Sequence, residues 1–357
     1  MPRLISSILA ASSSLLLCAS ACSSSSNSNP VPVDSGATAP DASGACSVTS
    51  FPYSGPQTPD VSAACGSCIE SSCCSELTTC AGDPSCAALA KCVAACPAYY
   101  SSCSTGCEAA QASGTMSGEA LTTCETTKCS VQCQNLSCLG SVHLPGAPPT
   151  VTFTFSPQDY PSNAPLTDAT VRVCGATDVD CAKPVATYST GSSGSVKVTA
   201  PANRAGVDGY LEVSSSTSVT TLVYLEFVQG LAALEAPASS PILSTATWGA
   251  LNAAVGITPD PKSGYLAFET TDCGGFALSG ATVSVSTATS ATGSAFLVGG
   301  VPSTTATMTD PSGIGSLVNI PQGPATLTGK LGGMIFSSQD LLFRAGAITS
   351  TNVPPTM

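Results

Sequence analysis

Cysteine is the residue type whose number and spacing dominate the possible chemistry of this sequence. The chain has 20 cysteines and 1 histidine in 357 residues, and fourteen of the cysteines lie between positions 65 and 138. Such a set could form disulfides, bind metal ions or exchange thiols. Zinc sites usually recruit histidine and separated Cys-x-x-Cys pairs, and here only Cys65 and Cys68 have that spacing. We therefore expect disulfides in an oxidising compartment, with no metal and no cofactor.

Residues 58–140, called the cysteine module below, are expected to fold as short helices. Many gaps between cysteines are three, four or six residues, so several cysteines would share one helix face. The intervening residues show no β-branched alternation, and Asp83-Pro84 has the pattern of an N-cap followed by proline at the first helical position. Because the aliphatic residues are few and small, disulfides must supply much of the stability.

Helix register constrains the pairing of these cysteines. In an antiparallel helical hairpin, the sequence positions of two residues that lie opposite each other add up to a nearly constant number. Two nested sets favour Cys80–Cys86, Cys74–Cys92 and Cys68–Cys96 in one hairpin, and Cys107–Cys129 and Cys103–Cys133 in a second. A rival register pairs Cys92 with Cys107 and Cys96 with Cys103, and spacing leaves it open. Six cysteines receive no assigned partner: Cys46, Cys65, Cys73, Cys124, Cys138 and Cys273.

Other residues that could do chemistry form no catalytic pattern. His143 lies in a Pro-Gly-rich boundary, where a nucleophile–histidine pair would lack rigid support. Five aspartates could act in acid–base catalysis or bind calcium, yet turn chemistry explains their positions and no EF-hand spacing occurs; they are Asp178, Asp180, Asp260, Asp272 and Asp310. We expect a protein that is not an enzyme.

The N-terminus resembles a bacterial lipoprotein signal. Residues 1–21 combine Arg3, an apolar stretch and Ala19-Ser20-Ala21 before Cys22. The resemblance implies that Cys22 carries the lipid, and Ser23 resembles an outer-membrane address. Residues 22–57 are rich in Ser, Asn, Pro and Gly and are expected to form a disordered tether. The predicted localisation is the cell envelope, lipid-anchored in the outer membrane, with plain secretion as the alternative.

The overall charge excludes one class of partner. The formal net charge is -12, with 10 basic and 22 acidic residues. Nucleic-acid binding requires a basic surface, so no nucleic-acid partner is expected.

From residue 150 the pattern changes to alternating apolar and polar residues separated by short turns, which is typical of β-sandwiches. We expect one sandwich over residues 150–230, a helical linker over 231–262 with Trp248 on its apolar face, and a second sandwich over 263–352. Leu166-Thr-Asp-Ala-Thr-Val and Leu278-Ser-Gly-Ala-Thr-Val indicate that the second repeats the first. Cys174 and Cys181 are expected to staple a loop in the first. The predicted fold class is thus a disulfide-stapled small α-helical module followed by two all-β, immunoglobulin- or transthyretin-like sandwiches.

The second sandwich resembles the carboxypeptidase regulatory-like domain, which is transthyretin-like. The motifs are Leu278-Ser-Gly-Ala-Thr-Val-Ser-Val, Thr309-Asp-Pro-Ser-Gly313 and Pro321-Gln-Gly323. The family usually has an aromatic residue where Ala325 stands. The resemblance implies a non-catalytic accessory fold.

Together these features predict a non-catalytic envelope lipoprotein that displays a disulfide-stabilised binding or scaffolding surface. Its expected partners are the membrane, through the lipid, with an envelope polysaccharide or a surface protein as further candidates. The alternative is a polysaccharide-binding or polysaccharide-processing accessory protein, although the aromatic residues are scattered without a stacking platform.

Overall fold

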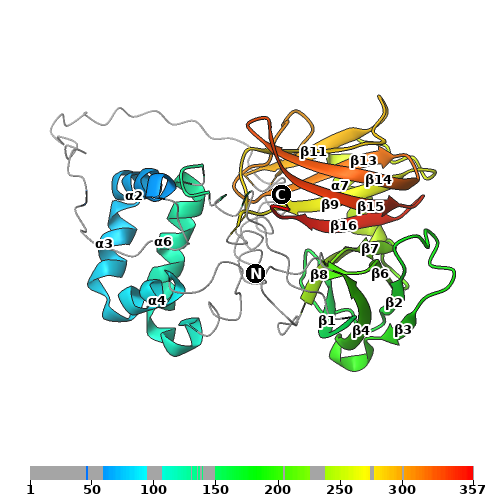
Figure 1. Ribbon diagram of the computed structural model, residues 1–357, viewed down its shortest axis with the longest axis horizontal. Coiled ribbons are helices and arrows are strands. Elements are labelled where there is room, and N and C mark those ends of the chain that lie inside the picture. The colour runs from blue at the N-terminus through cyan, green and yellow to red at the C-terminus, as the bar shows by residue number, and fades with distance from the viewer. Residues whose placement is uncertain are drawn as a thin grey trace, which may run out of the picture.

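The computed structural model describes residues 46, 59–94, 107–129, 131–134, 136, 139, 149–203, 206–225, 238–273, 277–299 and 301–356. Figure 1 shows a group of helices on one side of the molecule and two β-sandwiches on the other. This arrangement confirms the predicted fold class: a small disulfide-rich helical region followed by β-sandwich domains. Within these described ranges, no helix is long and apolar enough to cross a bilayer.

The helical region includes α2 (Pro59–Ser72), α3 (Cys74–Gly82), α4 (Pro84–Ala94), the short 3-10 helix η1 (Ala112–Gly114) and α6 (Thr115–Lys128). Helix α4 begins as the sequence predicts, because Ser85 N donates to Asp83 Oδ1 at 2.9 Å. The apolar core is small: Ile69, Leu77 and Leu121 are buried, together with half-cystines. Disulfides therefore carry a large share of the packing.

The disulfides follow one register across the whole region. Cys65–Cys133, Cys68–Cys129, Cys73–Cys124 and Cys92–Cys107 all have position numbers that add to between 197 and 199. The two halves of the region therefore run antiparallel. Cys80–Cys86 closes the α3–α4 turn as expected, and Cys46–Cys74 ties the preceding chain to α3.

Four expected pairings are wrong: Cys74–Cys92, Cys68–Cys96, Cys107–Cys129 and Cys103–Cys133. The observed pairs take Cys74, Cys68, Cys107 and Cys133 to other partners, and they follow the rival register at Cys92–Cys107. At about 100° per residue, positions six apart point about 120° away from each other on a helix. Cys74 and Cys80 therefore cannot both face α4. Cys96 and Cys103 lie outside the described residues.

In the first sandwich, two sheets face each other across a shared core. One sheet has the order β5 (Gly206–Val207), β4 (Val196–Asn203), β1 (Thr150–Tyr160), β8 (Ala238–Leu243). The other contains β7 (Thr221–Val223), β6 (Tyr210–Ser214), β2 (Thr170–Cys174) and β3 (Ala186–Ser189), with the 3-10 helix η2 (Gly191–Ser193) following β3. Phe153, Phe155 and Val198 pack against Val171 and Leu211 between the sheets.

The segment expected as a helical linker has two parts. Helix α7 (Thr245–Ala254) is capped by Ser244, whose Oγ accepts from Thr247 N at 3.0 Å. Before it, β8 pairs in parallel with β1 and so belongs to the first sandwich. That sandwich thus extends beyond residue 230, because its last strand returns beside its first.

The second sandwich repeats this arrangement. One sheet contains β12 (Val301–Ser303), β11 (Gly293–Val298), β13 (Ile314–Ile320), β9 (Gly264–Thr270) and β16 (Ile348–Val353). The other has the order β10 (Ala281–Val285), β14 (Gly323–Leu331), β15 (Met334–Phe343). As β8 pairs in parallel with β1, so β16 pairs in parallel with β9.

A threonine bridge occurs at matching places in both sandwiches. Thr190 Oγ1 donates to Leu166 O at 2.6 Å and accepts from Ala169 N. In the second sandwich, Thr309 Oγ1 donates to Leu278 O at 2.7 Å and accepts from Ala281 N. Each threonine lies four residues before a glycine with positive φ, Gly194 or Gly313. The repeat expected from the sequence is therefore structural as well.

The two sandwiches share one nine-stranded sheet, because β16 pairs with β9 on one side and with β7 on the other. Their cores lie on opposite faces of it. Leu266 faces β14 and β15 on the same side as Thr349 and Leu222, whereas Val223 and Leu211 face β1 and β4 on the other side. Trp248 of α7 covers the outer face over β9, with its ring 4.8 Å from that of Tyr265.

Candidate functional site at the junction of the two sandwiches

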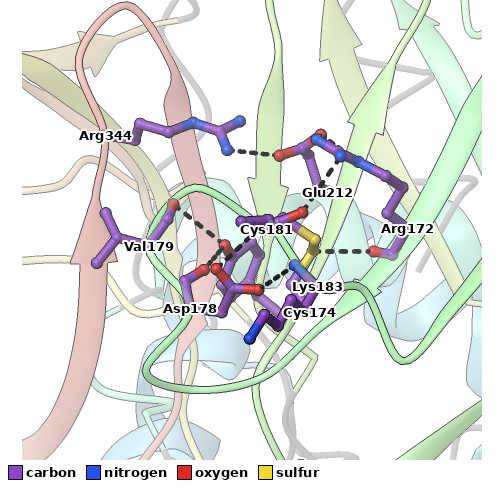
Figure 2. The surroundings of a disulfide bond; sticks show 10 residues. Arg172, Cys174, Asp178, Val179, Cys181, Lys183, Glu212 and Arg344 are labelled. Atoms are coloured by element: carbon purple, nitrogen blue, oxygen red, sulfur yellow. Dashed lines mark hydrogen bonds and ion pairs between the residues drawn. A yellow bond between two sulfur atoms is a disulfide. The ribbon is translucent and has the colours of Figure 1, made fainter.

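A cluster of charged and polar side chains lies where the sandwiches meet. Arg172 on β2 and Glu212 on β6 are directly opposite each other and point to the same face of the shared sheet. Glu212 is only 3% exposed and pairs with Arg172, and Arg344, which follows β15, approaches its other oxygen at 2.5 Å. Figure 2 shows the two guanidinium groups on opposite sides of this carboxylate. One carboxylate from the first sandwich is thus bound by a cation from each.

The Cys174–Cys181 disulfide holds a loop beside this cluster, as the sequence predicts. Arg172 Nη1 donates to Cys181 O at 3.3 Å. Within the loop, Asp178 accepts hydrogen bonds from Lys183 N at 2.8 Å and Ala182 N at 2.9 Å. These backbone N–H groups lower the pKa of the Asp178 carboxyl. The carboxylate therefore stabilises the loop and is not a free base.

Two tyrosines complete the junction. Tyr210 on β6 stacks on Tyr224, with ring centroids 5.7 Å apart. The Tyr210 hydroxyl donates to the carbonyl oxygens of Asp178 and Val179 in the stapled loop, while Tyr224 Oη accepts from Leu342 N of β15 at 2.8 Å. Burial raises the pKa of Tyr210 to about 12 and also raises that of Tyr224.

Chemically, this arrangement joins the two sandwiches through ion pairs and hydrogen bonds. Sulfur atoms of Cys174 and Cys181 lie within 4.8 Å of the Glu212 carboxylate, but disulfide sulfurs are not the thiolates that bind metals. The Glu212 oxygens face arginines, and the tyrosine hydroxyls are engaged with main-chain groups. The side chains therefore hold the two sandwiches together.

Of the other candidate aspartates, Asp260 and Asp310 accept backbone hydrogen bonds in turns. Asp260 accepts from Lys262 N at 3.0 Å, and Asp310 accepts from Ser312 N and from Gly299 N. Asp272 is buried, whereas Asp180 is exposed in the stapled loop. His143 and Cys22 lie outside the described residues.

The sequence analysis did not single out Arg172, Glu212 or Arg344. A signal was present, because Arg172 and Glu212 each interrupt an apolar run, Val-Arg-Val and Leu-Glu-Val. In a sheet covered on both faces, such central charges require partners. Arg344 follows Leu-Leu-Phe, and nothing in its local pattern indicates the contact.

No family model and no curated protein matches this chain. Among solved structures, the Bacillus anthracis TIE protein aligns at 14% identity over 58% of this chain and 34% of its own, with a TM-score of 0.19. This chain thus spans about a third of that protein. The shaft pilin SpaA from Lactobacillus rhamnosus GG aligns at 13% identity over 58% of this chain and 98% of its own, with a TM-score of 0.20. A streptococcal ancillary pilin aligns at 12% identity over 57% and 68%, with a TM-score of 0.18. TM-scores this low support no conclusion about function.

Proposed function

We propose that this protein is a non-catalytic, lipid-anchored envelope protein that displays a rigid pair of β-sandwiches as a binding or scaffolding surface. The observation that supports this most directly is the junction. Its charged and phenolic groups connect the two sandwiches, and Glu212 is too buried for a ligand to reach. Such a junction suits a protein that holds a fixed shape.

The disulfides and the signal-like N-terminus support the proposed compartment. Fifteen cysteines of the described residues are disulfide-bonded, which requires an oxidising environment. The resemblance of residues 1–22 to a lipoprotein signal supplies the anchor, and a coil from Cys22 to Cys65 would span on average ~35 Å. The helical region and the carboxypeptidase regulatory-like resemblance of the second sandwich both fit a surface accessory protein.

Binding of a polysaccharide receives less support. Carbohydrate sites usually present exposed aromatic rings for stacking. In the described part of the chain the large apolar side chains that are exposed are Met, Val and Ile, and Tyr210 and Tyr265 are buried. A scaffold for protein or membrane contacts is therefore the better proposal.

The test is mass spectrometry of the mature protein from its native host, combined with protease treatment of intact cells. We expect an acyl mass on Cys22, at most two free thiols, and cleavage of the protein on the cell surface if the outer leaflet holds it. An unmodified N-terminus together with ten or more free thiols would overturn the proposal.

A further inference from the structure

Exposed apolar side chains gather at one end of the second sandwich. The described residues include eight large apolar side chains that are exposed, and five of them are Val298, Val301, Met308, Met334 and Ile335. We call these five the tip residues. Four of them lie in two hairpins: Val298 and Val301 in β11–β12, and Met334 and Ile335 in β14–β15.

Both hairpins turn at the end of the sandwich where β9 finishes. Gly299 N, at the β11–β12 turn, donates to Asp310 Oδ2 at 2.8 Å. The neighbouring Thr309 N donates to Ala281 O at 2.8 Å, and Ala281 pairs with Leu331, which begins the β14–β15 turn. An unbroken chain of contacts therefore connects the two turns.

This end carries little charge: the exposed Lys330 lies directly opposite Ile335 in the β14–β15 ladder, and Asp310 lies in the neighbouring turn. Residues 286–309 contain no charged side chain, and neither do residues 331–339. Asp310 and Lys330 flank these stretches, and Asp310 is engaged in its own turn. In a chain of net charge -12, stretches of this kind do not fit a charged partner.

The turns also protrude. A Cβ placed on Gly299, Gly332 or Gly333 would meet nothing within 4 Å, so these turns project into open space. A stable protein interface buries about 800 Å² per partner with matched shape, which separated tips do not offer. Protruding, uncharged side chains are better suited to a deformable apolar medium than to a protein interface.

The helical region attaches at the same end. Gln134 Nε2 donates to Ser279 O at 2.7 Å, and Leu136 and Leu139 pack against the core of the second sandwich. The Cys46–Cys74 disulfide fixes the chain that leads back to the N-terminus onto this helical region. The predicted anchor and the tip residues therefore connect to the same end of the sandwich.

We propose that the tip residues insert into the interfacial layer of a lipid bilayer and orient the anchored protein on it. The proposal rests on the proposed lipid anchor for its biological setting. A few partly inserted side chains bind weakly by themselves. Attachment through a tether raises their effective concentration at the membrane, so weak insertion is sufficient to fix the orientation.

Vesicle flotation tests this with the full mature chain carrying Cys22→Ser, so that no lipid is attached. At lipid concentrations high enough to detect weak binding, we expect it to float with phosphatidylcholine vesicles, without sensitivity to salt. The double variants Met334→Ser/Ile335→Ser and Val298→Ser/Val301→Ser should each bind about tenfold more weakly. Val185→Ser is the matched control, because Val185 is 59% exposed on the first sandwich. It should bind normally.

A second measurement is independent of those variants. In Ile335→Trp, brominated phosphatidylcholine should quench the new tryptophan, whereas the native Trp248 signal should not change. Absence of flotation by the Cys22→Ser chain, equal loss in Val185→Ser, or a self-association that the tip substitutions abolish would each overturn the proposal. A missing acyl group on native Cys22 would instead overturn the proposed anchor, and vesicle binding would still be measured separately.

Discussion

At the level of single residues, Glu212 is the side chain on which the junction depends most. Glu212→Gln keeps its shape but leaves Arg172 and Arg344 facing each other without the carboxylate charge. Because Arg172 is partly exposed, we expect the free energy of unfolding to fall by about 2 to 4 kcal/mol. Urea unfolding measures this. Asp340→Asn is the control, since Asp340 is exposed and its carboxylate accepts a hydrogen bond from Thr326 Oγ1; an equal loss there would contradict the role of Glu212.

The tyrosines of the junction give a pH dependence. The Tyr210 phenol has its pKa raised by burial from 10.0 to about 12, so the folded protein keeps a proton that the unfolded chain has lost in this range. Stability from this group is complete below pH 10 and is lost as the pH rises toward 12. Ultraviolet titration should show a late phenolate transition that Tyr210→Phe removes. A normal titration in the native protein would show that the junction is open.

One disulfide should join the helical region to the second sandwich. Cys273 is buried and disulfide-bonded, and each of the other described half-cystines is paired with another described one. We expect Cys138 as its partner, because the nearby Leu136 and Leu139 pack on that sandwich. Cys138 itself lies outside the described residues. A non-reducing peptide map should link the two peptides, and a Cys273 peptide joined to Cys96 or Cys103 would contradict this pairing.

At the level of elements, the helical region should depend on its disulfides and on one close contact. A Cβ on Gly114 would lie 2.4 Å from the backbone of Ser85 and Cys86, whereas Gly82 has nothing within 4 Å. Gly114→Ala should therefore destabilise this region by about 1 to 3 kcal/mol. Gly82→Ala should have little effect. The loss of helical circular dichroism on heating measures both variants.

Reduction should separate the helical region from the sandwiches. Its apolar core is small, and disulfides of this kind contribute about 2 to 4 kcal/mol each. Under strong reductant we expect the helical signal to be lost while the β-sheet signal remains. Helix retained after complete reduction would show that the apolar core is sufficient by itself.

The sequence predicted where individual elements form better than it predicted which elements pair with each other. Local signals were enough for the Asp83-Pro84 helix start and for the Cys174–Cys181 staple, because each depends on neighbours within a few residues. The disulfide register was misplaced, since it depends on which distant helices meet. The same limit applies to β8, whose parallel pairing with β1 has no local signature.

For the whole molecule, β16 determines whether the two sandwiches behave as one. It lies between β9 and β7, and so its six residues complete one sandwich and join it to the other. Because the two cores lie on opposite faces of one continuous sheet, unfolding of either sandwich would expose a sheet edge of the other.

We expect residues 150–356 of the intact protein to give a single calorimetric transition. A chain ending at Ala347 should lose this coupling, because β7 and β9 would both become edges. The control is a chain ending at Pro354, which keeps β16 and removes only the last residues. Two resolved transitions in the intact β-region would show that neither the shared sheet nor the Glu212 junction couples the unfolding of the sandwiches.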